Sequence, residues 1–209
     1  MSVFERCLEK CRARKGAVVY SDGEDRRVVS AAAKLIREGL VEPILFGDPE
    51  KVRAALQESG ETGVSLQVVN PYNPALLQHN AAEYMSIQKD KGKDISEEEA
   101  IKAVKNPLAA GALMVRRGEA EIGVAGNLSS TADVIRAGLR MVGTAAGSKP
   151  VSSFFFMLKD NNVCMFTDCA VIPEPTSAQL ADIAISTAGA YKRVMGDGAR
   201  LALPSLSPQ

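Results

Sequence analysis

The chain has 209 residues, 46% of them apolar, and its 25 basic and 25 acidic side chains give a formal net charge of zero. This composition indicates one or two compact α/β units with a buried core and excludes a disordered polypeptide. Balanced charge argues against a nucleic-acid-binding protein, because affinity for a phosphate backbone needs an excess of Lys and Arg. The longest apolar runs are far shorter than the roughly 20 residues that span a bilayer, so we expect no membrane association.

The first part of the chain alternates short apolar runs with longer amphipathic segments. Within residues 24–40, for example, Val28, Ala32 and Leu35 recur at helical spacing. In chain order we predict a helix at 3–14, a strand at 17–20, a helix at 24–40, a strand at 43–46, a helix at 50–58 and a strand at 66–69.

The middle of the chain continues this alternation after a turn cluster at residues 70–74. Ser96 and Glu99 have the spacing of a capping box, which predicts a helix beginning there. The remaining expected elements are a helix ending near 88, a polar loop at 89–94, a break at 106–107, a helix at 108–118, a strand at 121–125, a loop at 126–130 and a helix at 131–139. Continuous apolar strands that alternate with helices predict an α/β fold of three αβα layers, with a mostly parallel sheet covered on both faces.

The last third of the chain differs in composition, since small and turn-forming residues gather at 143–150. We therefore place a domain boundary near residue 148, with a first α/β domain at 1–148 and the beginning of a second at 149–209. Strands are expected at 152–159 and 163–171, joined through Asp160, Asn161 and Asn162, a segment that resembles a hairpin turn. Thr176 is expected to cap a helix that ends near residue 195, and 201–203 is expected to form one further strand.

The N-terminus has no apolar segment followed by a small-residue cleavage site, so no secretory signal is expected. The four cysteines are too few for a disulfide framework in a chain of this length. A zinc site would need more ligands than these cysteines and His79, the only histidine. We predict a cytoplasmic protein with reduced thiols and no metal site.

Two loops stand out as candidate sites, because ligands of parallel α/β sheets bind beyond the carboxyl ends of the strands. In the loop at 126–136, the hydroxyls of Ser130 and Thr131 and the N–H groups of a helix N-terminus suit a phosphate or a carboxylate. Arg136, about one turn further along, could add a planar cationic fork. The alternative is that Ser130 or Thr131 only caps the helix and Arg136 is solvated.

The other loop, at 21–27, ends in Arg26 and Arg27, which open a helix where the helix dipole disfavours cations. An anion nearby would offset this, either a local acid such as Asp22, Glu24 or Asp25, or a ligand.

In these loops the chain resembles the phosphate acetyl/butyryl transferase family. The matching stretches are 22–27, 45–48, 89–92, 126–136, 144–147, 166–173 and 175–184, and their order is specific although no single motif is decisive. The resemblance implies a two-domain fold similar to isocitrate and isopropylmalate dehydrogenases, with a cleft between the domains and dimeric assembly. It also implies reversible acetyl transfer between phosphate and coenzyme A, the latter a substrate, with no metal or other cofactor.

Carried over residue by residue, the resemblance gives Arg136 the role of the family's active-site arginine, and places Arg27 near the coenzyme site. Ser130 and Thr131 match a hydroxyl-rich loop that lines the cleft. The basic loop containing Lys91 could contact coenzyme A phosphates, although it also fits a merely solvated loop. The implied partners are acetyl-CoA, phosphate, acetyl phosphate and a second copy of the chain.

Two departures from the family pattern affect these expectations. Gln88 stands where relatives often carry an arginine. Family members also continue past residue 209 with a Ser-Arg pair, a downstream Asp taken as the general base, the rest of the second domain and the C-terminal elements that complete the first domain. Residues 204–209 do not continue the usual Ser-rich loop, which suggests a frameshift, a premature stop or a deliberately shortened chain. We therefore expect an incomplete second domain and impaired activity. The alternatives are a phosphate butyryltransferase, or a non-catalytic truncated relative that only binds or oligomerises.

Overall fold

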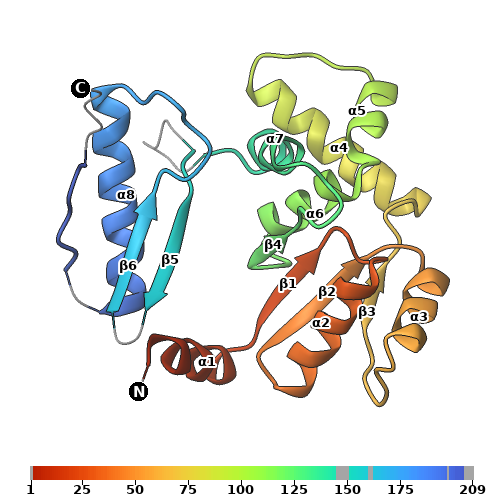
Figure 1. Cartoon of the computed structure of the whole chain (residues 1–209). Coiled ribbons are helices and arrows are strands. Elements are labelled where there is room, and N and C mark those ends of the chain that lie inside the picture. The colour runs from red at the N-terminus through yellow and green to blue at the C-terminus, as the bar shows by residue number, and fades with distance from the viewer. Residues whose placement is uncertain (1, 145–150, 160–161, 197, 205–209) are drawn as a thin grey trace. The chain divides into compact units, whose positions relative to one another are not determined.

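The computed structural model describes residues 2–144, 151–159, 162–196 and 198–204, and the chain divides into two compact units (Figure 1). The larger unit runs from Lys10 to Gly143, and the smaller unit combines the N-terminal residues up to Glu9 with the chain from Thr144 onward. The division between the units falls within helix α1 (Val3–Ala13), between Glu9 and Lys10. The boundary predicted near residue 148 lies in 145–150, outside the described residues.

A parallel sheet forms the centre of the larger unit. Its elements are β1 (Gly16–Tyr20), α2 (Arg26–Arg37), β2 (Val41–Phe46), α3 (Pro49–Glu58), β3 (Gln67–Val69), α4 (Pro74–Asp90), α5 (Glu97–Val104), α6 (Pro107–Arg116), β4 (Ile122–Val124) and α7 (Thr131–Met141). The strand order is β3-β2-β1-β4, and every pairing is parallel (Figure 1). The predicted α/β fold with a parallel sheet is therefore confirmed for this unit.

Alternating side chains of β1 and β2 enter two different cores. Val18, Tyr20 and Leu45 pack with residues of α2 and α3 on one face of the sheet. Val19 and Phe46 pack with residues of α6 on the other face. Since both faces are covered by helices, these strands are apolar without a polar side, as expected for a parallel sheet.

Side-chain caps determine where most helices begin. The capping box predicted from the sequence is present at α5, where Ser96 Oγ accepts from the Glu99 N–H and the Glu99 carboxylate accepts from the Ser96 N–H. Asp25, Asp48 and Asn106 cap α2, α3 and α6 in the same way, each by accepting an N–H of the first turn.

The smaller unit contains the strands β5 (Phe154–Lys159) and β6 (Asn162–Thr167) and helix α8 (Ser177–Met195). The strands pair antiparallel with Lys159 opposite Asn162, which confirms the predicted hairpin pairing. The turn residues Asp160 and Asn161 lie outside the described residues. Thr176 caps α8 as predicted, and Gly196 ends it in the left-handed conformation, with φ 86°.

Two strand predictions in this unit were wrong. Strand β6 ends at Thr167 rather than near residue 171, because the Asp168 carboxylate accepts the N–H groups of Val171 and Ile172 at 2.9 and 2.6 Å and so turns the chain. Residues 201–203 form no strand, since they pair with no described strand and both Leu201 and Leu203 are exposed.

None of the helices in the described ranges combines the length and the apolar character that crossing a bilayer requires.

Candidate functional site

The carboxyl ends of β1, β2 and β4 lie at one edge of the larger unit's sheet, because the three strands are parallel. The loop between β1 and α2, residues 21–25, follows the middle strand of the three. It therefore lies between the loops that follow β2 and β4. Different residues of this loop contact the loop after β4, the loop after β2 and the start of α2.

Asp22 connects this loop to the one that follows β4. Its Oδ2 accepts hydrogen bonds from three consecutive backbone N–H groups, those of Gly126, Asn127 and Leu128, at 3.1, 2.9 and 3.3 Å. Its Oδ1 accepts from Ser129 Oγ at 3.4 Å. Successive N–H groups that converge in this way form a concavity suited to an anion. In this chain the anion is the protein's own carboxylate.

Gly23 and Glu24 connect the same loop to the end of β2. A Cβ on Gly23 would lie 2.6 Å from the Phe46 carbonyl oxygen, so only glycine fits this close approach of two backbones. The Glu24 carboxylate accepts from the Asp48 N–H at 2.8 Å and from Lys51 Nζ at 2.9 Å. The hydrogen bond to Glu24 raises the pKa of Lys51.

Asp25 neutralises Arg27 at the start of α2. Its carboxylate accepts from the Arg27 N–H at 2.8 Å and from the guanidinium at 3.1 Å. The hydrogen bond from the Arg27 side chain is the main cause that lowers the pKa of Asp25 to about 2. A local acid therefore offsets the cation, one of the two alternatives left open by the sequence. The Arg27 side chain remains 69% exposed.

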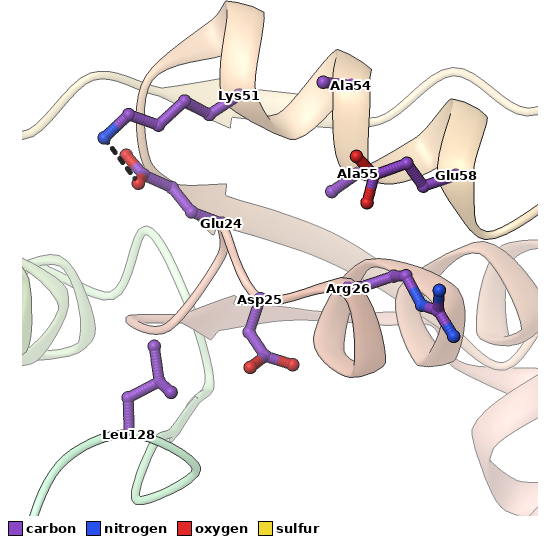
Figure 2. A pocket seen from close by; sticks show the side chains of 8 residues that line it. All are labelled: Glu24, Asp25, Arg26, Lys51, Ala54, Ala55, Glu58 and Leu128. Carbon is purple, nitrogen blue, oxygen red and sulfur yellow. Dashed lines mark hydrogen bonds and ion pairs between the residues drawn. The ribbon is translucent and has the colours of Figure 1, made fainter.

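A surface cleft of about 470 Å³ opens beside this loop (Figure 2). Its lining consists of Glu24, Asp25, Arg26, Lys51, Ala54, Ala55, Glu58 and Leu128. Figure 2 shows Lys51 directed at Glu24, whereas Arg26 points away from that pair. Three carboxylates against two cations leave the lining formally negative, so the cleft does not suit a phosphate.

The predicted hydroxyl site lies at the N-terminus of α7. Ser130 caps this helix, since its Oγ accepts from the Asp133 N–H at 3.2 Å and donates to Asp133 Oδ2 at 2.7 Å. Thr131, the first helical residue, is exposed. Ser130 thus has the capping role that the sequence left as an alternative, and Thr131 has an accessible hydroxyl.

Arg136 lies one turn further along α7, with its side chain 53% exposed and paired with Asp133. It lines a small pocket of about 130 Å³ between α5, α6 and α7. The full lining is Ala103, Asn106, Ala109, Asp133, Arg136, Ala137, Arg140 and Met141. Arg140 is a second arginine in this pocket, one turn after Arg136, which the sequence analysis did not single out. The periodicity of α7 could have found it.

Lys91 also lies near α7, because its Nζ donates to the Arg140 carbonyl oxygen at 3.4 Å. Ser130 and Thr131 therefore lie at the start of α7, Arg136 near its middle and Lys91 beside its last turn. Arg27 lies at the start of α2, where it pairs with Asp25, and it lines neither pocket.

The sequence analysis missed the role of Asp22, which it treated only as a counter-charge for the arginines. The available signal was an acid directly after a buried strand, at the edge where the loops of neighbouring parallel strands meet. In the described part of the chain, no group of three or more His, Cys, Asp or Glu residues could hold a metal ion.

Comparison with known proteins gives consistent matches. Residues 2–209 match the family model described as "Phosphate acetyl/butaryl transferase". Phosphate acetyltransferases from Thermoanaerobacterium thermosaccharolyticum and Clostridium acetobutylicum are each 32% identical over 99% of this chain, which covers 64% and 63% of their lengths. A phosphotransacetylase structure from Streptococcus pyogenes superposes with a TM-score of 0.85 at 33% identity, and EutD phosphotransacetylase from Staphylococcus aureus with 0.83 at 30%. Both superpositions cover 92% of this chain and 58% of the other. The chain thus spans just under two thirds of the length of these relatives.

Proposed function

Because the chain belongs to the phosphate acetyl/butyryl transferase family, we propose that it acts in the reversible transfer of an acetyl group between phosphate and coenzyme A. The observation that carries this proposal is the match to phosphate acetyltransferases over 99% of the chain. The names of these relatives favour acetyl over butyryl as the acyl group. The fold would be that of the isocitrate and isopropylmalate dehydrogenases with an incomplete second domain, and the assembly a cytoplasmic homodimer.

In this proposal, Arg136 holds the anionic end of acetyl phosphate at the N-terminal half of α7. Its present partner Asp133 lies three residues earlier on the same exposed face, so a phosphate could replace that weak surface pair. The accessible Thr131 hydroxyl can donate a hydrogen bond to the same group, next to the positive end of the helix. Acyl transfer of this kind depends on positioning and on charge stabilisation, which these groups can supply.

Lys91 and Arg27 are proposed to contact coenzyme A. Lys91 lies beside the last turn of α7, where its ammonium group can reach a phosphate close to Arg136. Arg27 would have to exchange its bond with Asp25 for a bond with a ligand phosphate.

The test is formation of acetyl-CoA from acetyl phosphate and coenzyme A by the 209-residue chain, compared with Arg136→Ala. We expect the variant to lower kcat/KM by about 10²- to 10³-fold, the usual effect of removing one group that stabilises charge in the transition state. Arg53→Ala is a matched control, because Arg53 pairs with Glu50 three residues earlier on α3 and is similarly exposed. An equal loss in both variants would contradict the role of Arg136.

The same assay separates the alternatives. Faster turnover of butyryl phosphate than of acetyl phosphate would favour a phosphate butyryltransferase. If the wild-type chain shows no turnover but binds coenzyme A in a calorimetric titration, the non-catalytic relative is favoured instead.

A further inference from the structure

We propose that Asp22 is a positioning residue: its carboxylate acts as an internal anion that fixes the loop 126–130 and thereby the start of α7. The link to acyl transfer rests on the proposed function, because α7 carries Ser130, Thr131 and Arg136. The claim that Asp22 fixes this loop does not rest on the proposed function, since it follows from hydrogen bonds between two loops of the larger unit.

The contacts of Asp22 are unusual in number and in direction. One oxygen accepts three successive N–H groups between 2.9 and 3.3 Å, and the other accepts a hydroxyl from the next residue, Ser129. The carboxylate caps of α2 and α3, Asp25 and Asp48, each accept an N–H of their own helix two residues on. The donors of the hydrogen bonds that the Asp22 carboxylate accepts instead lie more than 100 residues away in the sequence.

Apolar packing contributes little to the position of this loop. Strand β4 has only three residues, all of them exposed, and Ile122 and Val124 are 56% and 44% accessible. Its one described strand partner is β1, whose extension ends with the hydrogen bond from the Ser21 N–H to the Val124 carbonyl oxygen at 3.2 Å. Since apolar packing on β4 is weak, the four hydrogen bonds of Asp22 form a direct link between the end of β1 and the loop.

The path from Asp22 to the start of α7 is short. Gly126 adopts the left-handed conformation, with φ 101°, and turns the chain so that its own N–H and the next two point at the carboxylate. Ser129 follows, and Ser130 then caps the helix. A shift of the loop away from Asp22 would therefore move the first turn of α7 with it.

The same geometry limits where a ligand phosphate can bind. The N–H groups of Gly126, Asn127 and Leu128 form the concavity that a phosphate would otherwise occupy, and the Asp22 carboxylate both fills it and repels a second anion. A phosphate is therefore directed to Thr131 and Arg136, further along the loop and the helix.

The test compares Asp22→Ala and Asp22→Asn with the wild-type chain by amide hydrogen exchange and by calorimetric titration of acetyl phosphate. In Asp22→Ala we expect exchange at residues 126–128 to become at least about 10-fold faster, because the N–H groups lose their acceptor. We expect the part of the acetyl phosphate affinity that Arg136 contributes, measured by comparing each variant with its own Arg136→Ala double variant, to fall by about 10- to 100-fold, because a small displacement of binding groups has effects of this size. Asp22→Asn, which keeps one acceptor oxygen but loses the charge, should lie between the two.

Added sodium formate gives the decisive readout. Formate has the size and charge of the group that Asp22→Ala removes, so it should restore both slow exchange and the contribution of Arg136 to acetyl phosphate affinity in that variant, and change neither in the wild-type chain. Sodium chloride at the same ionic strength is the control for salt. A variant that is merely destabilised would not recover with formate in preference to chloride.

Asp48→Ala is the matched control variant, because Asp48 lies at the same edge of the sheet and caps only its own helix. We expect it to leave exchange at 126–128 unchanged. The proposal would be overturned if residues 126–128 of Asp22→Ala exchanged as slowly as in the wild-type chain, or if formate did not slow their exchange. If the wild-type chain binds no acetyl phosphate, the proposed function fails, whereas the exchange and formate measurements still decide the role of Asp22.

Discussion

The two units of the chain bury their apolar residues to very different extents. In the larger unit, Val19, Leu45 and Leu113 have no accessible surface. In the smaller unit, the run 154–158 is among the most apolar of the whole sequence, yet Phe155 is 60% exposed. The burial of an apolar strand therefore depends on whether helices cover both faces of its sheet. The apolar composition of the strand is not sufficient.

The structural reason lies in the sheets. Helices cover both faces of the larger unit's sheet. In the smaller unit, α8 packs against β6, where Thr187 and Thr167 are joined by a hydrogen bond of 3.2 Å. Register places Phe155 opposite Phe166 on one face of the hairpin, and both rings are more than half exposed. An apolar face of this kind is typical of a surface that associates with another protein surface.

Replacing one large apolar side chain by alanine in each unit tests this difference in burial most directly. We expect Leu113→Ala to destabilise the larger unit by about 3–4 kcal/mol, because it leaves a cavity in a fully packed core. Phe155→Ala should change unfolding free energy by less than about 1 kcal/mol and should reduce self-association. Urea unfolding and light scattering measure the two effects. A large loss of stability in Phe155→Ala would mean that the smaller unit has a well-packed core after all.

A methyl group at Gly23 should have the next largest effect. The added Cβ would lie within 2.8 Å of Leu45 Cβ and of backbone atoms of Phe46, so we expect Gly23→Ala to cost about 2–3 kcal/mol in urea unfolding. Gly138→Ala is its control, because no atom other than its chain neighbours and the backbone of α7 itself lies within 4 Å of the Cβ position. Equal stability of the two variants would show that the loop can move away from β2, and would weaken the description of the larger unit as tightly packed.

Acid should loosen the smaller unit through Asp168. Burial raises the pKa of this carboxyl, but hydrogen bonds from Ser153, Ile172 and Val171 outweigh it and lower the pKa to about 2, from an ordinary 3.8. The resulting stability is fully present above pH 4 and is lost as the pH falls from about 4 to about 2. We expect a loss of about 1–2 kcal/mol, after allowance for solvent screening.

Amide exchange of β5 and β6 between pH 5 and pH 2.5 checks this expectation, with Asp168→Asn as the variant that cannot titrate. The variant should be less stable than the wild-type chain at pH 5, and its hairpin should depend less on pH over this range. A wild-type hairpin whose protection is independent of pH would contradict the role assigned to Asp168.

Gly189→Ala should have the smallest effect, and it should be stabilising. Gly189 lies inside α8, and an added Cβ would meet only Arg193 Nη1, at an ordinary contact distance of 3.7 Å. Replacing glycine by alanine within a helix stabilises it by about 0.5–1 kcal/mol. Exchange at α8 should slow, whereas exchange at β1 and β2 should not change if the two units open independently. Slower exchange in both would indicate that they unfold together.

The sequence predicted those features that depend on residues close together in the chain. The caps at Ser96 and Thr176 were found because cap and partner are three residues apart. A local acid beside Arg27 was one of two alternatives, because Asp25 is two residues away. The order and type of nearly all elements also followed from local periodicity.

Features that depend on distant contacts could not be predicted in this way. The β1–α2 loop gives no sign of which N–H groups Asp22 will meet, because those groups follow a strand near the other end of the larger unit. The end of β6 was missed because the Asp168 side chain, rather than the strand propensity of the apolar residues after it, decides the backbone path. Residues 201–203 have the composition of a strand, but a strand also requires a neighbour.

The place of β1 in the sheet has a consequence for how the larger unit acquires its structure. Only α2 separates β1 from β2, so this pair can form as soon as a short stretch of chain is available. Its pairing with β4 must wait for a long segment to close, which carries a larger entropic cost and is a slow step in folding. The edge of β1 that pairs with β4 therefore stays open until the chain as far as β4 is available.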